Sequence, residues 1–406
     1  MNRLFLDIHA LQTVPPSNIN RDDTGAPKSA IYGGVPRARV SSQAWKRATR
    51  EYFTDEHLVE ASELGVRTKK VAEALAARIT TLDPTVDSAD ALQLAAAVIE
   101  TATRSKIEVP KRKTTQAKGQ TDVGDETEQQ AGPQSKYLMF LSARQIDGLA
   151  SLAVDGAGDI TAYLKNKDNK ARAKQIADTH HSVDIALFGR MVADSTDFNV
   201  DAAAQVAHAI SVHRLEVESD YFTAVDDENT KAESGAGMIG TIEFNSATLY
   251  RYAAVGIHQL AANLGAGLPK EESLTALVRR AIEAFVHAFI ASLPKGKINT
   301  FGHHTLPDAV VVKLRTSRPI SFVAAFEEPV TADLGSGHLH SASARLADHV
   351  HEIERAYGDE SSTQAWVLRL GPATERLAGI GQEVSSLSSL VATVGQAVAE
   401  RMEKPA

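Results

Sequence analysis

The feature that most constrains the fold is the alternation of short strand-like apolar segments with longer helical segments along the chain. Residues 4–14 form an apolar run that favours a strand, whereas apolar positions in 42–53 recur at helical spacing. Further strands are expected at 137–141, 183–188, 239–252 and 308–315, and further helices at 71–101 (broken at Asp83-Pro84), 202–214, 271–292 and 385–402. Interspersed strands and helices with long insertions predict an α+β sheet domain.

An abrupt change in composition marks residues 105–136, which contain almost no large apolar side chains. Such a segment cannot bury enough apolar surface to order itself, so we expect a flexible surface loop. Its early basic cluster, Lys111, Arg112 and Lys113, is compatible with a nucleic-acid contact or with a solvated loop, and the composition favours the solvated loop.

The overall composition excludes several classes of protein. The 406 residues are 43% hydrophobic and 23% charged, which is typical of a globular chain with one large or two ordinary domains. The chain has no cysteine, which excludes disulfides, thiol catalysis and cysteine zinc sites and favours a reducing cytoplasm. The N-terminal apolar run is interrupted by Asp7 and His9, so we expect neither a signal peptide nor a membrane span, and a cytoplasmic location.

A basic island stands out in a chain whose formal net charge is -8. The segment 20–50 contains no acid after Asp23, and its cations are Lys28, Arg37, Arg39, Lys46, Arg47 and Arg50. Positive charge held locally against an acidic background favours binding of a polyanion such as nucleic acid. A charged helix face is also compatible with simple exposure to solvent.

The helix expected at 42–53 has two distinct faces. Its apolar face is formed by Trp45, Ala48 and Tyr52. The opposite face carries the cations of the helix together with Gln43. Ser41 or Ser42 can cap the first turn, whose unpaired amides and positive dipole end favour an anion. Just before the helix, Gly33 and Gly34 permit the close approach of a ligand backbone.

Four sequence blocks in the same order resemble the CasC family, the repeated backbone subunit of the type I-E CRISPR Cascade complex. The first block runs from NRDD at 20–23 through K-x-A-I-x-G-G at 28–34 and R-x-R-x-S-S-Q at 37–43 to W-K-R-A-x-R at 45–50. The others are VDIALFGRM at 183–191, AHAISVHRLEVESDYFTAVDD at 207–227 and GTIEFNSATLYRYA at 240–253. The resemblance covers roughly the first two-thirds of the chain and fades beyond about Gly265.

This resemblance implies a modified RRM-like (ferredoxin-like) palm with a helical fingers insertion and a protruding thumb β-hairpin. We therefore expect palm at 1–56, a fingers insertion at 57–182, palm at 183–213, the thumb at 214–240, and palm with C-terminal helices at 241–406. No repeat is visible within the chain, so any repetition would come from head-to-tail copies.

CasC subunits are not catalysts: several copies polymerise along one CRISPR RNA, grip its backbone and displace one nucleotide at regular intervals. The resemblance thus implies as partners CRISPR RNA, target DNA through the guide, copies of the chain, and the subunits CasA, CasB, CasD and CasE. It implies no cofactor, no metal and no membrane. Sequence is then read by base pairing, so the protein needs only shape and phosphate contacts. The low aromatic content, 5%, agrees, because it argues against base stacking on the sheet.

The charges and the resemblance together assign RNA binding to ten residues: Arg21, Lys28, Arg37, Arg39, Ser41, Gln43, Lys46, Arg47, Arg50 and Met191. By resemblance, Phe222 and Thr223 form the thumb wedge at the displaced base, where an apolar side chain can replace a stacked base. Phe222 is also compatible with anchoring the hairpin to its own core, and Met191 with filling a strand.

A metal-dependent ribonuclease that processes CRISPR RNA is the alternative from another class of protein. The histidine pair His180-His181 and the carboxylates Asp22-Asp23 could supply metal ligands or a general base. However, no HExxH motif, nucleophile elbow or Walker loop is present, and adjacent carboxylates on an extended segment point to opposite faces. Metal-dependent cleavage that is lost in variants of His180 or Asp22 would favour the ribonuclease over the scaffold.

Overall fold

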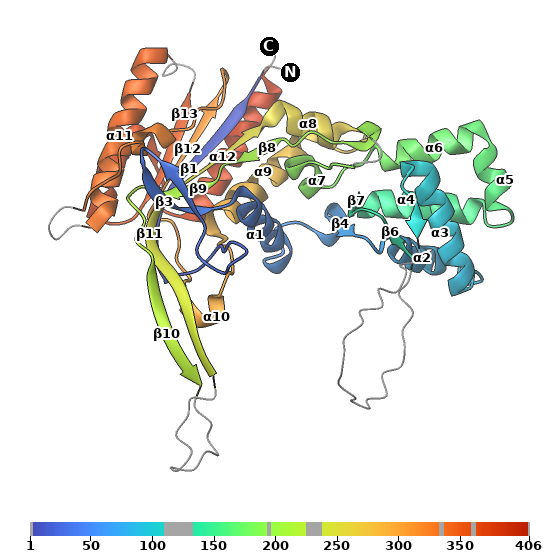
Figure 1. Cartoon of the computed structure of the whole chain (residues 1–406). Helices are drawn as coiled ribbons and strands as arrows, with labels where there is room; N and C mark the ends of the chain where they lie inside the picture. The colour runs from blue at the N-terminus through green and yellow to red at the C-terminus, as the bar shows by residue number, and fades with distance from the viewer. Residues whose placement is uncertain are drawn as a thin grey trace, which may run out of the picture. The chain divides into compact units, whose positions relative to one another are not determined.

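The computed structural model describes residues 3–108, 133–192, 196–224, 238–332, 337–358 and 363–404 (Figure 1). They fall into two compact units: unit 1 comprises residues 1–59, 204–260 and 275–406, and unit 2 comprises residues 60–203 and 261–274. The α+β fold expected from the sequence is confirmed. The division into palm, fingers and thumb stays a prediction, and the basic cluster 111–113 lies outside the described residues.

Unit 1 is built on one sheet, which has ten strands among the described residues. Its main path runs in the order β14 (Gln382–Glu383), β13 (Gln364–Arg369), β12 (Ala309–Arg315), β1 (Phe5–Ser17), β11 (Met238–Gly256), β9 (Ala209–Ser211), β3 (Val35–Val40) and β2 (Ser29–Tyr32). β1 lies at the centre, antiparallel to both β11 and β12. The strands predicted at 4–14, 239–252 and 308–315 are therefore confirmed.

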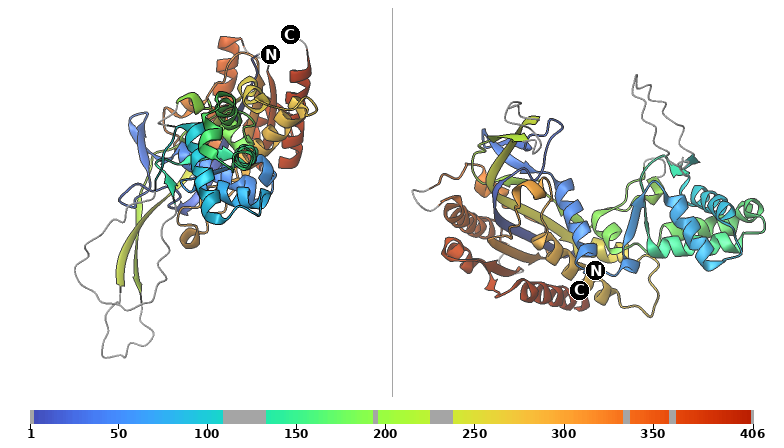
Figure 2. Two further views of the ribbon diagram at one scale, coloured as in Figure 1. Left: turned by 90° about the vertical axis from the view of Figure 1, so that its right-hand side faces the viewer. Right: turned by 90° about the horizontal axis from the view of Figure 1, so that it is seen from below.

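Helices cover both faces of this sheet (Figure 2). Leu11 of β1 joins the core beneath α11 (Gly337–Tyr357), whereas Val14, on the opposite face of the strand, packs with Trp45 of α1 (Ser42–Asp55). α9 (Leu274–Ala291) shares the face of α1, because the buried Arg251 guanidinium lies against both Trp45 and Phe289. α12 (Leu387–Glu403) in turn contacts α9, since Arg279 Nη1 donates to Gln396 Oε1 at 2.9 Å. The helices predicted at 42–53, 271–292 and 385–402 are confirmed.

Two predicted elements are wrong. Residues 202–214 form no helix: β8 (Ala204–Val206) pairs with β11, and β9 pairs with β11 and β3. Here the ladder hydrogen bonds outweigh the helix propensity of alanine, which is a weak preference. Residues 183–188 form a helix, α7 (Val183–Phe188), rather than a strand. Five of its six residues are buried, so the apolar run shows no periodicity that distinguishes a helix from a strand.

Unit 2 is mainly helical. Its larger helices, α2 (Val71–Leu82), α3 (Ser88–Thr103), α4 (Ala143–Asp155) and α6 (Lys167–Ala177), enclose a core rich in alanine and leucine. The predicted break at Asp83-Pro84 is confirmed, and the Asp87 carboxylate then caps α3. β7 (Met139–Ser142), predicted at 137–141, pairs with β4 (Gly65–Thr68). β5 (Ile107–Glu108) pairs with β6 (Gln134–Ser135), so both ends of the segment predicted to be a loop, 105–136, form paired strands, and its part 109–132 lies outside the described residues.

The remaining described helices are short or connect larger elements: α5 (Ile160–Lys165), α8 (Ile257–Gly265) and α10 (Ile298–Phe301), with 3-10 turns at Ala61–Glu63, Thr196–Phe198, Val323–Phe326 and Pro372–Ile380. No helix in the described part of the chain combines the length and apolar character needed to cross a bilayer.

A buried ionic network joins β1, β12 and α11. Arg315 donates from Nε to Asp7 Oδ2 at 3.1 Å and from Nη2 to Glu354 Oε1 at 3.0 Å. Lys313 Nζ donates to the same Glu354 oxygen at 2.6 Å, and the Tyr252 hydroxyl donates to Asp7 Oδ1 at 3.0 Å. All four charged side chains are buried, so each depends on these partners in place of water.

The buried carboxyl group of Asp7 should make the stability of the protein depend on pH. Burial raises the pKa of Asp7 from 3.8 to about 6, because the loss of hydration outweighs the attraction of Arg315. The folded state therefore holds this proton more tightly than the unfolded state, and Asp7 makes folding less favourable as the pH rises from about 4 to about 6. A shift of about two units corresponds to about 3 kcal/mol.

We expect the difference in unfolding free energy between wild type and Asp7→Asn to fall by up to about 3 kcal/mol across that pH range, as measured by urea unfolding. An NMR titration that places the pKa of Asp7 at or below 4 would contradict this expectation.

Candidate nucleic-acid interface

The predicted basic segment forms a loop, the β2–β3 hairpin and α1, all within unit 1, and Asn20 ties these parts together. Its Oδ1 accepts a hydrogen bond of 2.8 Å from the Ser41 amide at the start of α1. The Asn20 carbonyl accepts from the Lys28 amide, and the Lys28 carbonyl accepts from the Arg39 amide, both at 2.9 Å. The backbones of Lys28 and Arg39 are therefore held close to the first turn of α1.

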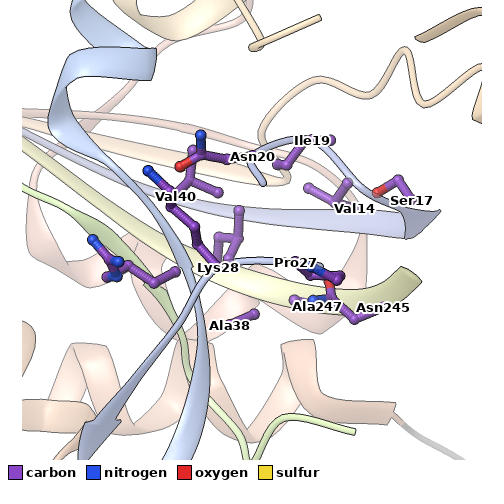
Figure 3. Close-up of a pocket in the computed structure, with 12 residues that line it drawn as sticks. Val14, Ser17, Ile19, Asn20, Pro27, Lys28, Ala38, Val40, Asn245 and Ala247 are labelled. Atoms are coloured by element: carbon purple, nitrogen blue, oxygen red, sulfur yellow. The ribbon is translucent and has the colours of Figure 1, made fainter. Parts of the chain in front are cut away.

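Lys28, labelled in Figure 3, and Arg39 line a pocket of about 20 Å³. Its other lining residues come from β1, the following loop, β3 and β11: Val14, Ser17, Ile19, Asn20, Pro27, Ala38, Val40, Asn245, Ala247 and Leu249. A cavity of this size has room for one water-sized group, so it fits a phosphate oxygen and not a base. Neither cation has a carboxylate partner among the described residues, which leaves their charge available to an anion.

The polar face of α1 carries cations that differ in their surroundings. Gln43 and Arg47 are exposed, whereas Lys46 and Arg50 are partly buried. The Arg47 guanidinium forms an ion pair of 2.7 Å with Glu51, and this hydrogen bond raises the pKa of Arg47. Lys46 has no such partner in the described part of the chain, and partial burial lowers its pKa. The uncompensated charge of Lys46 thus makes it the stronger candidate for a phosphate contact.

Arg37 has a structural role, which corrects its assignment to RNA binding. Its side chain is fully buried, and the guanidinium donates to four backbone carbonyls, those of Tyr32, Ser211, Phe326 and Glu327, at 2.9–3.2 Å. A buried donor needs partners because it has lost water, and backbone carbonyls supply them here. Arg37 therefore anchors the β2–β3 hairpin and has no access to a ligand.

The carboxylate of Asp22 shapes the loop before β2. Its Oδ1 accepts from the hydroxyl and amide of Thr24 and from the Ala26 amide. The Thr24 hydroxyl is the largest cause that lowers the pKa of Asp22. The neighbouring Arg21 is exposed. Among the described residues, no group of three or more histidines or carboxylates could hold a metal ion.

A two-stranded arm extends from the sheet, formed by β10 (Glu218–Ala224) and the first half of β11 (Figure 1). Phe222 lies opposite Gly240, and its ring covers this glycine so closely that an added Cβ would lie 2.4 Å from the ring. The residue Phe222 remains 36% exposed. Tyr221 and Thr223 point to the other face of the arm, because neighbouring residues in a strand alternate. Phe222 and Thr223 therefore cannot contact a base from the same face.

Met191 lies in unit 2 and is 83% exposed. The preceding Arg190 is buried and donates to the carbonyls of Phe198 and Ala177, at 2.8 and 3.0 Å. The backbone before Met191 is thus anchored while its apolar side chain reaches solvent. This exposure excludes the interpretation that Met191 fills a core.

Comparisons with known proteins cover nearly the whole chain. The family model described as "CT1975-like protein" matches residues 6–393. The chain belongs to this CT1975-like family. A solved structure titled "CRISPR RNA-guided surveillance complex, pre-nicking" includes a chain with 31% identity to this CT1975-like protein and a TM-score of 0.79, covering 97% of this chain and 100% of the other. A second, titled "CRISPR RNA-guided surveillance complex", has 28% identity and a TM-score of 0.69, covering 97% and 99%. No curated protein matches.

Sequence reasoning missed two residues at this interface, Asn20 and His208. Asparagine is a common capping residue. Asn20, however, accepts from the Ser41 amide, 21 positions away, and no local sequence pattern reveals such a distant partner. His208 belongs to one of the four blocks, but it lies within the helix wrongly expected at 202–214, so its position between two strands was not predicted. In the structure it lies in the connection between β8 and β9, beside Arg39.

Proposed function

We propose that this protein is a non-catalytic, guide-RNA-binding backbone subunit of a type I-E Cascade complex, with a modified RRM-like palm. Copies polymerise head to tail along one CRISPR RNA in the cytoplasm and present it to target DNA, with CasA, CasB, CasD and CasE as the other subunits. The observation that carries this proposal is the group of cations without carboxylate partners around the start of α1: Lys28, Arg39 and Lys46. The surveillance-complex chains that match along 97% of this chain support the same role.

The bases of a guide RNA must stay free to pair with target DNA. A protein surface that binds the guide through charge and shape, without reading its bases, meets this requirement. Lys28 and Arg39 surround a pocket too small for a base, and both can donate to phosphate oxygens. Phosphate contacts position a nucleic acid but carry no sequence information. The same surface can therefore grip every segment of one guide in turn.

Co-expression of the chain with CRISPR RNAs of increasing length tests this proposal. We expect assemblies whose mass increases in steps with RNA length, in which the RNA remains intact when Mg²⁺ or Mn²⁺ is added. Mass photometry and denaturing gels measure both properties. An assembly whose size does not depend on RNA length, or metal-dependent cutting of the guide, would overturn the proposal.

The wedge role of Phe222 makes a separate prediction. Gly240→Ala should displace the Phe222 ring, because the added Cβ would lie 2.4 Å from it, and should reproduce the effect of Phe222→Ala. We expect both variants to reduce the periodic signal of displaced bases about tenfold, as read by 2-aminopurine fluorescence along the guide, since a lost stacking contact costs roughly 1–3 kcal/mol.

Tyr221→Ala is the matched control, since Tyr221 is 61% exposed on the other face of the arm. If Tyr221→Ala abolishes the periodic signal while Phe222→Ala preserves it, the wedge is assigned to the wrong face.

A further inference from the structure

His208 lies beside Lys28 and Arg39 at the candidate interface. Its Nδ1 is 3.3 Å from Nη1 of Arg39. The Arg39 guanidinium is itself held in place, because Nε donates to the Ser29 carbonyl at 3.0 Å. Arg39 thus links an exposed imidazole to the pocket that Lys28 and Arg39 line.

This contact determines which ring nitrogen carries the proton. Arginine has donors only, so Nδ1 of His208 must accept and the proton of the neutral ring must reside on Nε2. Nε2 has no hydrogen-bond partner in the described part of the chain. His208 therefore offers a free N–H donor next to two cations.

The surroundings of His208 favour the neutral form of its ring. Partial burial, followed by the charges of Arg39 and Lys28, lowers the pKa of His208 below its usual 6.5. These two cations are the charged groups that act on the ring, and no carboxylate among the described residues offsets them. A neutral donor is compatible with neighbouring cations, whereas a third positive charge would be repelled.

The backbone around His208 is fixed by the sheet. Val206 pairs with Ala253 on one side, and Ala209 pairs with Val40 on the other. The Ala207 amide also donates to the Tyr252 carbonyl at 3.0 Å. A two-residue connection between paired strands leaves little freedom, so the imidazole is preorganised for its ligand.

We propose that His208 is a further guide-binding residue that donates a hydrogen bond from Nε2 to the phosphate gripped by Lys28 and Arg39. This inference rests on the proposed function, because the phosphate belongs to the guide RNA. It adds a neutral donor to a site in which the other two donors are charged. The three side chains come from three segments that only the sheet brings together.

Amide substitutions test the donor directly. His208→Gln carries an amide donor near the position of Nε2, whereas His208→Asn keeps an acceptor near Nδ1 for Arg39 and cannot reach the distal position. In filter binding of a CRISPR RNA, we expect about tenfold weaker affinity for His208→Asn and His208→Ala, and affinity within about threefold of wild type for His208→Gln. Wild-type affinity in His208→Asn would show that His208 only positions Arg39, and would overturn the inference.

The salt dependence supplies an independent readout. A neutral donor releases no counterion, so His208→Ala should leave the slope of log K against log salt unchanged, whereas Arg39→Ala should reduce it by about 0.7. A similar reduction in His208→Ala would mean that the bound imidazole is charged, and would contradict a neutral donor.

His351→Ala, at an exposed histidine of α11, is the matched control and should bind like wild type. If wild type binds no CRISPR RNA, the proposed function fails together with this inference; if wild type binds and His208→Ala is unchanged, only the inference fails.

Discussion

Replacing Lys28, Arg39 and Lys46 together by alanine is expected to weaken guide-RNA binding about a hundredfold or more at physiological salt. Each of these cations lacks a carboxylate partner among the described residues, so each can contribute a charge-assisted contact to phosphate. Three lost contacts should also reduce the slope of log K against log salt by about two, at about 0.7 for each contact on a single strand. Filter binding at several salt concentrations measures both quantities.

A control of equal charge separates this local effect from the change in net charge. The variant Arg355→Ala, Arg401→Ala and Lys404→Ala removes three cations from α11 and the C-terminal end of α12 and should leave binding near the wild-type level. The loss in the Lys28, Arg39 and Lys46 variant should be the same for unrelated guide sequences, because phosphates are identical along the RNA. A loss confined to particular guides would show that these residues read bases, and would refute the backbone grip.

Glu354→Gln is expected to lower the free energy of unfolding by about 3–5 kcal/mol. The Glu354 carboxylate accepts from both Lys313 and Arg315, whose side chains are 1% and 0% exposed. Glutamine has nearly the same volume, so the substitution removes the charge and leaves two buried cations with Asp7 as the remaining carboxylate of the network. Urea unfolding followed by circular dichroism measures the loss.

Glu352→Gln is the matched control, because Glu352 is exposed on the same helix, α11. Its effect should remain within about 0.5 kcal/mol of wild type. If Glu354→Gln lowers the free energy of unfolding by less than about 1 kcal/mol, then water or a rearranged partner compensates the charges of Lys313 and Arg315. The network would then be more accessible to water than the burial of its side chains indicates.

Local patterns predicted the elements whose signals are self-contained. The spacing of apolar and charged residues predicted α1, and Asp83-Pro84 marked the end of a helix because proline cannot continue one. Ser41 occupies the N-cap position of α1 as expected, but its side chain makes no capping hydrogen bond. The same reasoning failed for 202–214 and 183–188. In both, the neighbours in space decided the conformation, and a uniformly apolar or alanine-rich run contains no periodicity that reports those neighbours.

At the candidate interface, too, the local sequence does not show which residues are neighbours in space. Charge alone placed Arg37 with Lys28 and Arg39, since all three are cations in one short segment. The structure separates them: Arg37 is buried among carbonyls, whereas Arg39 lines the pocket and contacts His208. Strand alternation cannot account for this difference, because Arg37 and Arg39 are two positions apart on β3 and alternation places them on the same face. Their different partners, Phe326 for Arg37 and His208 for Arg39, are distant in the sequence.

By itself, the sequence of this protein determined that an α+β chain contains a basic segment with a helix, because charge and apolar spacing are local properties that can be read without knowing the fold. Which cations face an anion was settled by tertiary contacts. Burial of Arg37, pairing of Arg47 with Glu51, and the approach of His208 to Arg39 all depend on distances between side chains. Hydration, hydrogen bonding and Coulomb attraction act over those distances, so the availability of a charge cannot be read from its position in the chain.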